Sequence, residues 1–198
     1  MPSGAAGWRR SQRLLQPPVL LLDLRLERAR VLLDLLRDRS GETVHLAVLD
    51  GPNIVYLFNI ESKQALRMHS YLGVHKPAHC TAEGRAMLAF CPEPVLRKVL
   101  RAGLAPRTPN TVTDPRALAT LLDQVRRNGF ALDDEESEVG MRGVAAPVFD
   151  ASGLAVASVG VVGPLQRFTA PRQRELAAQV LATAEAISLH LGHQPAEA

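Results

Sequence analysis

Hydrophobic residues change their spacing several times along the chain, and each spacing predicts a different element. Between residues 24 and 40 they recur at steps of three and four, which is typical of an amphipathic helix. The positions are Ala29, Leu32, Leu33 and Leu36. Gly41 is expected to end this helix. Ahead of it, residues 1–23 are predicted to form an irregular basic tail, because Pro17 and Pro18 interrupt any helical pattern.

After Gly41 the pattern alternates, as expected for strands. One side of residues 43–49 carries Val44, Leu46 and Val48, and the other side carries Thr43, His45 and Ala47. The turn-forming sequence DGPN follows and leads into a second apolar run at 54–60, so a β-hairpin is predicted. A third strand is predicted near residues 65–69.

The rest of the chain is predicted to form four helices and three strands. The first helix is expected to begin near Thr81. The other three are expected to span about 94–101, 113–129 and 171–191. The strands are expected at the start of FALDDE and in a hairpin formed by 143–150 and 154–162. Because tight turns join most strands, the predicted fold class is α+β, with a largely antiparallel sheet covered by helices on at least one face.

Composition restricts the class of protein. The 198 residues are 46% hydrophobic, which suits one globular domain, with or without an appendage. Only 4% are aromatic and the net charge is +3, so neither base stacking nor a basic nucleic-acid surface is indicated. Two cysteines are too few for a disulfide framework, and no apolar run is long enough for a membrane helix. A cytoplasmic location without membrane contact is expected.

Candidate chemistry is concentrated within residues 71–90, where nitrogen, sulfur and oxygen ligands suitable for zinc occur close together. The candidate ligands are His75, His79, Cys80 and Glu83. The two histidines would share one face of a helix, but Pro77 between them opposes a helix. The simpler interpretation is a histidine in a loop followed by a partly buried one, so no metal is expected.

Cys80 near a helix start is also a candidate nucleophile, since such a position can lower a thiol pKa. The adjacent His79 is poorly placed to act as its base, and packing as a small apolar side chain explains Cys80 as well, so no catalytic residue is expected. The acidic run DDEESE at 133–138 lacks the glycine and spacing of a calcium loop. Asp133 directly follows an apolar strand, and its side chain is expected to point inward.

The helix start near Thr81 is itself a candidate binding feature. Thr81 is a natural N-cap, and the free N–H groups of a helix N-terminus favour an anion such as a carboxylate. Gly84 lowers helix stability by roughly 1 kcal/mol relative to alanine, which close approach of a ligand or of another backbone would explain. Simple packing of the helix against the sheet accounts for the same residues.

Several segments, in this order, resemble the effector-binding domain of IclR-type bacterial transcriptional regulators. They are SGETVHLAVLDG, PAHCTAEGRAMLA, TVTDPRAL, VRRNGFALDDEESEVGMRGVAAPVFD and the VGP that precedes the last helix. The resemblance covers about residues 25–192. It implies a GAF-like fold over residues 41–193, that is, a curved antiparallel sheet with flanking helices and a pocket on one side. Residues 24–40 would be a linker helix and 194–198 a C-terminal tail.

The resemblance also implies a small-molecule effector, often a carboxylic acid or an aromatic metabolite, and a homodimer or tetramer. The implied effector-binding positions are His79, Thr81, Ala82, Glu83, Asp133, Gly143, Gly160 and Val162. Members of the family carry a cysteine or small residue and frequent serines at three positions that are here Gly143, Gly160 and Val162. These replacements predict open volume and a larger or more apolar effector. No cofactor is expected.

A winged helix-turn-helix precedes the linker helix in the family and needs roughly 60 residues. The stretch before the linker helix is much shorter here, so this DNA-reading domain is predicted to be absent. We expect a ligand-sensing regulatory domain that reaches DNA only through a winged helix missing from the chain or supplied by a full-length partner. The alternative is an interaction subunit that pairs with full-length relatives.

Overall fold

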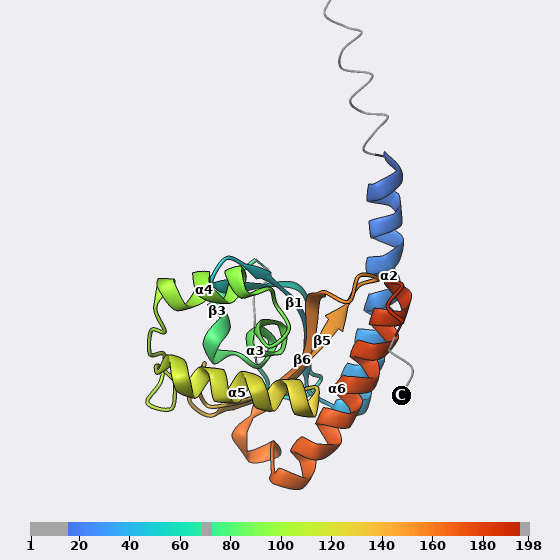
Figure 1. Ribbon diagram of the computed structural model, residues 1–198. Helices are drawn as coiled ribbons and strands as arrows, with labels where there is room; N and C mark the ends of the chain where they lie inside the picture. The colour runs from blue at the N-terminus through green and yellow to red at the C-terminus, as the bar shows by residue number, and fades with distance from the viewer. Residues whose placement is uncertain (1–15, 69–72, 195–198) are drawn as a thin grey trace, which may run out of the picture.

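The computed structural model describes residues 16–68 and 73–194, which form one sheet with helices on both faces (Figure 1). The sheet has six strands in the order β3-β2-β1-β6-β5-β4, and all neighbouring strands are antiparallel. The strands are β1 (Thr43–Asp50), β2 (Asn53–Ile60), β3 (His75–Pro77), β4 (Ala131–Asp134), β5 (Met141–Phe149) and β6 (Ala155–Pro164). The predicted α+β fold class, with an antiparallel sheet, is confirmed.

Two hairpins form the centre of the sheet. Turns that contain Gly51 and Gly153 connect β1 to β2 and β5 to β6. Both glycines have positive φ, a conformation that a side chain would disfavour. Pairing of β1 with β6 then joins the two hairpins, so the beginning and the end of the chain contribute adjacent central strands.

The helices divide between the two faces of the sheet. They are α2 (Gln16–Ser40), α3 (Ala82–Leu88), α4 (Glu93–Ala102), α5 (Pro115–Asn128) and α6 (Ala170–His190), with short 3-10 helices η1 (Ala78–Cys80) and η2 (Leu165–Arg167). The long helices α2 and α6 lie side by side against one face, and α3, α4 and α5 lie over the other (Figure 1).

The sheet separates two apolar cores. Because successive side chains of a strand point to opposite faces, Val44 and Leu46 pack with α2 and α6, whereas Ala47 packs with the helices of the other face. Tyr56 and Ala145 belong to this second core.

Polar contacts fix the end of α2. The Arg172 side chain of α6 donates to the carbonyl oxygen of Ser40 at 2.6 Å. Arg167 donates two hydrogen bonds, of 2.5 and 2.6 Å, to the carboxylate of Glu42, just after α2. The end of α2 is therefore held to the segment that leads into α6.

The bounds differ from the predictions in two places. The helix predicted for 24–40 begins at Gln16, so residues 16–23 are helical although they were predicted to be irregular. Pro17 and Pro18 fall in the first turn, where the N–H groups have no intrahelical partner and proline is tolerated. Residues 65–68 form no strand, and β3 forms later, at His75–Pro77. Residues 1–15, 195–198 and the predicted strand residue His69 lie outside the described part of the chain.

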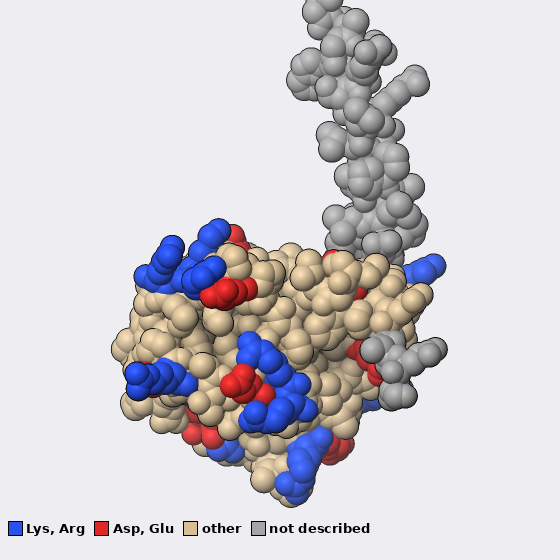
Figure 2. Space-filling model, in the orientation of Figure 1, with Lys and Arg blue, Asp and Glu red and all other residues tan. Residues whose placement is uncertain are grey.

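Charges are mixed on the surface. On the face shown in Figure 2, basic side chains occur in separate groups with acidic side chains beside several of them. None of the helices within 16–68 and 73–194 is both long enough and apolar enough to cross a membrane.

Candidate functional site

Predicted site residues from three neighbouring strands lie side by side on the sheet face that α3 covers. Asp133 of β4 pairs with Gly143 of β5, and Gly143 pairs with Val162 of β6. Paired residues of antiparallel strands point to the same face, so these positions form a row across the sheet. Gly160 lies two residues before Val162 and therefore shares this face.

Ala82, the first residue of α3, lies over this row. A Cβ atom added at Gly143 would stand 3.5 Å from the Ala82 Cβ and 3.6 Å from the Asp133 Cβ, which are ordinary van der Waals distances. The fold thus brings Ala82, Asp133 and Gly143 together, with room for a small group at Gly143.

Glu83 fills the space beside Gly160. Its Oε1 atom would lie only 2.6 Å from a Cβ added at Gly160. The prediction of open volume at Gly160 is therefore wrong, because the Glu83 carboxylate occupies it. The same Oε1 accepts a hydrogen bond of 2.9 Å from Nδ1 of His45. Burial opposes the charged form of Glu83, but the hydrogen bond and charge of His45 outweigh it and lower the Glu83 pKa.

Asp133 is buried, as predicted, and begins a turn. Its Oδ1 accepts hydrogen bonds from the backbone N–H groups of Glu136 at 2.8 Å and Ser137 at 3.3 Å, and the Ser137 hydroxyl donates to Oδ2. Burial raises the pKa of Asp133 to about 6, although these hydrogen bonds and Arg85 act in the opposite direction. This carboxyl group can therefore change its protonation state close to neutral pH.

Thr81 caps α3 as predicted. Its Oγ1 accepts a hydrogen bond of 3.2 Å from the N–H of Gly84. Gly84 is explained by its own backbone surroundings, since a Cβ atom there would stand 2.1 Å from the carbonyl oxygen of Ala78. Of the two explanations for this glycine, close approach of another backbone is the one observed.

His79 and Cys80 are buried against the backbone. Nε2 of His79 hydrogen-bonds the carbonyl oxygen of Ala105 at 3.2 Å, and burial lowers the pKa of this histidine. Burial raises the pKa of the Cys80 thiol to about 11, so the thiol stays protonated at neutral pH, the reverse of an activated nucleophile. In the described ranges, no group of three or more His, Cys, Asp or Glu side chains is placed to hold a metal ion.

A polar cavity of about 270 Å³ opens beside this cluster. Ser137, which donates to Asp133, lines it together with Cys80 and two basic residues, Lys76 and Arg107. Lys76 lies 3.7 Å from the Glu138 carboxylate, also in the lining, and Arg107 has no ion-pair partner within the described residues. The cavity wall therefore offers positive charge next to a buried carboxyl group.

Sequence reasoning missed three residues of this region, Lys76, Arg107 and His45. Lys76 and Arg107 are isolated basic residues, which give no spacing signal. His45 is 1% exposed, its ring centroid lies 4.2 Å from that of Tyr56, and its Nε2 atom is buried without a hydrogen-bond partner among the described residues. The alternation of β1 already placed His45 on this face, and that signal was sufficient to include it.

Comparisons with known proteins give a consistent result. The family model described as "Bacterial transcriptional regulator IclR C-terminal" matches residues 21–189. The chain is 38% identical to the HTH-type transcriptional regulator KdgR of Escherichia coli (strain K12) over 155 residues, which are 78% of this chain and 59% of KdgR. The chain thus spans about three-fifths of that relative's length.

Two solved structures are also similar. The crystal structure of Thermotoga maritima IclR has a TM-score of 0.81 and 39% sequence identity, covering 85% of this chain and 69% of that chain. A double mutant of the PobR inducer-binding domain from Acinetobacter, in complex with 3-hydroxybenzoic acid, has a TM-score of 0.74 and 27% identity, covering 82% of this chain and 96% of that one.

Proposed function

This chain belongs to the IclR family of bacterial transcriptional regulators, and on that basis we propose that it is a small-molecule-sensing regulatory domain. Its effector would be an organic acid, aliphatic or aromatic, bound in the polar cavity beside Asp133. The domain would act in the cytoplasm as part of a homo-oligomer and would reach DNA through a winged-helix domain. No catalytic step, cofactor or metal enters this proposal.

The observation that carries the proposal is the polar cavity next to Asp133. Lys76 and Arg107 line it, and Ser137 links its wall to the row of Asp133 and Gly143. Positive charge that is only partly compensated attracts an anion, and arginine is well suited to a carboxylate because it can donate two parallel hydrogen bonds. An organic acid therefore matches the charge of this cavity.

The state of Asp133 supports the same ligand class. A carboxylate that arrives near this buried group favours its protonated form, because two negative charges repel each other at short range. Since the pKa of Asp133 is already about 6, little free energy is needed to protonate it. Binding of an acid should therefore become tighter as the pH falls from about 7 to about 5.

The comparison with PobR supports an aromatic acid among the candidates. Its inducer-binding domain, which has a similar fold, holds 3-hydroxybenzoic acid. In this chain Glu83 takes up the volume beside Gly160, so a compact acid with one ring or a short chain fits better than a bulky effector.

Regulation would be a shift between conformations. An effector moves such an equilibrium only by as much as its affinities for the two states differ. The output would be the position of α2, which packs on the opposite face of the sheet beside α6.

The test is thermal unfolding with benzoate, 3-hydroxybenzoate, pyruvate and gluconate, each compared with its amide. We expect at least one acid to raise the unfolding temperature in a concentration-dependent way and its amide to have little effect. Arg107→Gln should abolish most of this stabilisation. Arg101→Gln, an exposed arginine on α4 outside the cavity lining, serves as the matched control.

Two outcomes would contradict the proposal. One is that none of the acids stabilises the folded wild-type protein. The other is that Arg107→Gln and Arg101→Gln respond to the active acid as the wild type does, which would place the ligand elsewhere.

A further inference from the structure

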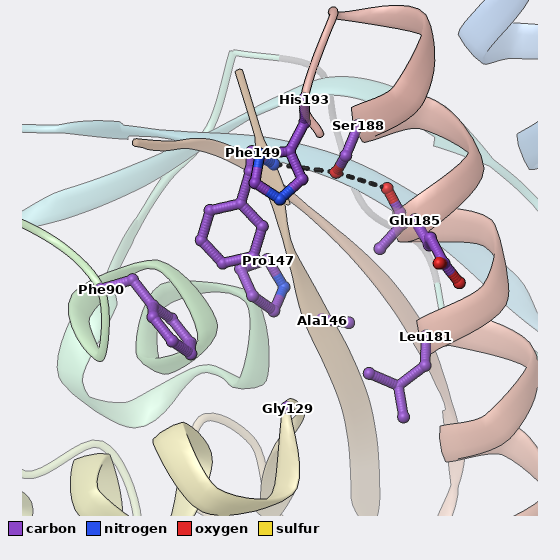
Figure 3. Close-up of a pocket in the computed structure, with 10 residues that line it drawn as sticks. Phe90, Gly129, Ala146, Pro147, Phe149, Leu181, Glu185, Ser188 and His193 are labelled. Atoms are coloured by element: carbon purple, nitrogen blue, oxygen red, sulfur yellow. Dashed lines mark hydrogen bonds between the residues drawn. The ribbon is translucent and has the colours of Figure 1, made fainter. Parts of the chain in front are cut away.

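A second cavity, of about 310 Å³, lies where β5 approaches the end of α6 (Figure 3). It shares no lining residue with the polar cavity at Asp133. We propose that this cavity is a second ligand site, separate from the acid site, and that it binds a flat, uncharged aromatic compound.

The cavity exists because β4 is shorter than β5. Strand β4 pairs with β5 only at residues 142–145, so β5 continues beyond its neighbour. Phe130 and Gly129, which precede β4, belong to the turn after α5. The part of β5 at 146–149 is left beside a notch, which α6 closes from the other side (Figure 3).

This stretch of β5 is poorly suited to accept another strand. Pro147 has no N–H group, and the N–H of Phe149 donates to the Ser188 hydroxyl at 2.9 Å. The Ser188 hydroxyl in turn donates to the carbonyl oxygen of Ala184 at 2.7 Å. Strand addition relies on free main-chain groups along an edge, and two of the donors here are missing or already used. A small molecule is therefore a better occupant than an extended peptide.

The walls favour an aromatic ring. Phe90 and Phe149 meet edge to face, with centroids 5.2 Å apart and planes at 86°. The ring of His193 stacks on Phe149 at 5.2 Å and 28°. Aromatic rings attract one another in such edge-to-face and offset arrangements beyond the area they bury. A ligand ring entering the notch would extend an aromatic cluster that is already formed.

Size and polarity define the ligand further. Three small residues, Gly129, Ala146 and Ala184, are part of the lining and leave space in the cavity. Leu181 adds an apolar side (Figure 3). An apolar cavity of about 150 Å³ is enough to hold benzene, so this one accommodates a substituted ring or two fused rings. Glu185 is the one charged lining residue, and it is exposed to solvent, so an anionic ligand is disfavoured.

Occupation of this cavity would act on α6 directly. Four of its lining residues belong to α6, the helix that packs against α2. An aromatic ligand here would therefore contact α6, which packs beside α2 on one face of the sheet, whereas the proposed acid would bind on the other face. The two ligands could then influence α2 by different routes.

The test uses indole as the probe and methyl-labelled protein in two-dimensional NMR titrations. We expect saturable shifts of the Leu181 and Ala184 methyl signals in the wild type. Ala184→Leu fills the central space and should abolish indole binding. Ala182→Leu, an exposed position on the same helix, is the matched control and should bind indole as the wild type does.

Further variants keep the result interpretable. If Ala184→Leu does not fold, Phe90→Leu removes one aromatic wall at a partly exposed position and should weaken indole several-fold. Arg107→Gln, at the acid site, should leave indole binding unchanged. The proposal is overturned if the wild type shows no saturable shifts. It is also overturned if Phe90→Leu and Ala184→Leu bind like the wild type, or if Arg107→Gln alone abolishes binding.

Discussion

On the sheet face that packs against α2 and α6, the buried strand residues are apolar, among them Val44, Val159 and Val161. On the opposite face, β1 and β4 bury His45 and Asp133. Burying a polar group lowers stability unless a partner compensates it. Asp133 has such partners in Glu136 and Ser137, whereas Nε2 of His45 has none among the described residues. The apolar face mainly stabilises the fold, and the polar face carries the proposed acid site.

The largest effect should come from the apolar face. Leu176 on α6 is fully buried, so Leu176→Ala should lower the free energy of unfolding by about 2–5 kcal/mol through lost contacts and a cavity. Urea denaturation measures it. Leu189→Ala, on the same helix but 52% exposed, should change it by less than about 0.5 kcal/mol. If both variants lost a similar free energy of unfolding, packing of α6 in this apolar core would not be what stabilises it.

Asp133 should give the largest pH effect. Its folded pKa of about 6 lies above the ordinary value of 3.8, so between these values the folded protein keeps a proton that the unfolded chain releases. Stability should therefore fall as the pH rises through this window, by up to about 3 kcal/mol. Asp133→Asn should remove this dependence, as measured by urea midpoints from about pH 4 to pH 7. Asp134→Asn, at the exposed neighbouring residue, should retain the pH dependence of stability. If the stability of Asp133→Asn depended on pH as strongly as that of the wild type, the argument from burial would be contradicted.

Substitutions at two glycines should distinguish an effect on stability from an effect on ligand binding. Gly84→Ala should destabilise the protein by about 1–3 kcal/mol, because the added Cβ collides with the Ala78 carbonyl. Gly143→Ala should be nearly neutral for stability, because its Cβ would meet Ala82 and Asp133 at ordinary distances. Thermal unfolding with and without the active acid then compares the two. We expect Gly143→Ala to weaken the response to the acid, and an undiminished response would remove Gly143 from the site.

The smallest effect concerns a helix that covers the polar face. Asp114 accepts a hydrogen bond of 2.9 Å from the N–H of Ala117 at the start of α5. Asp114→Ala should lower the free energy of unfolding by about 1 kcal/mol. Thr113→Ala, one residue before the cap, is the control in the same denaturation experiment and should have less effect. Equal losses would mean that the cap contributes little.

Regular periodicity made most of the fold predictable. Alternation identified β1, β2, β5 and β6, and apolar stripes with caps identified α5 and α6 close to their observed bounds. Residues 65–68 of the strand predicted at 65–69 form no strand, because a short apolar run does not reveal whether a neighbouring strand is available to pair with it. The early start of α2 was missed because prolines in a first turn look like helix breakers.

The candidate site was predictable only in part. The resemblance named Asp133, Gly143 and Val162 as effector-binding positions, and the strand register places them in one row. The direction of the Glu83 carboxylate does not follow from local sequence, since it depends on the distance between α3 and β6. The cavity with Lys76 and Arg107 was also missed, because it is assembled from segments far apart in the chain.

The division of the molecule by one sheet has an evolutionary consequence. Substitutions around Gly143 and Glu83 would change the proposed acid site without disturbing the apolar contacts between α2 and α6, because the sheet separates the two sets of side chains. Conversely, substitutions where α6 packs against α2 would change the proposed output and leave the proposed acid site unchanged. Such independence would let related regulators evolve to bind new effectors while the packing of α2 against α6 stays the same.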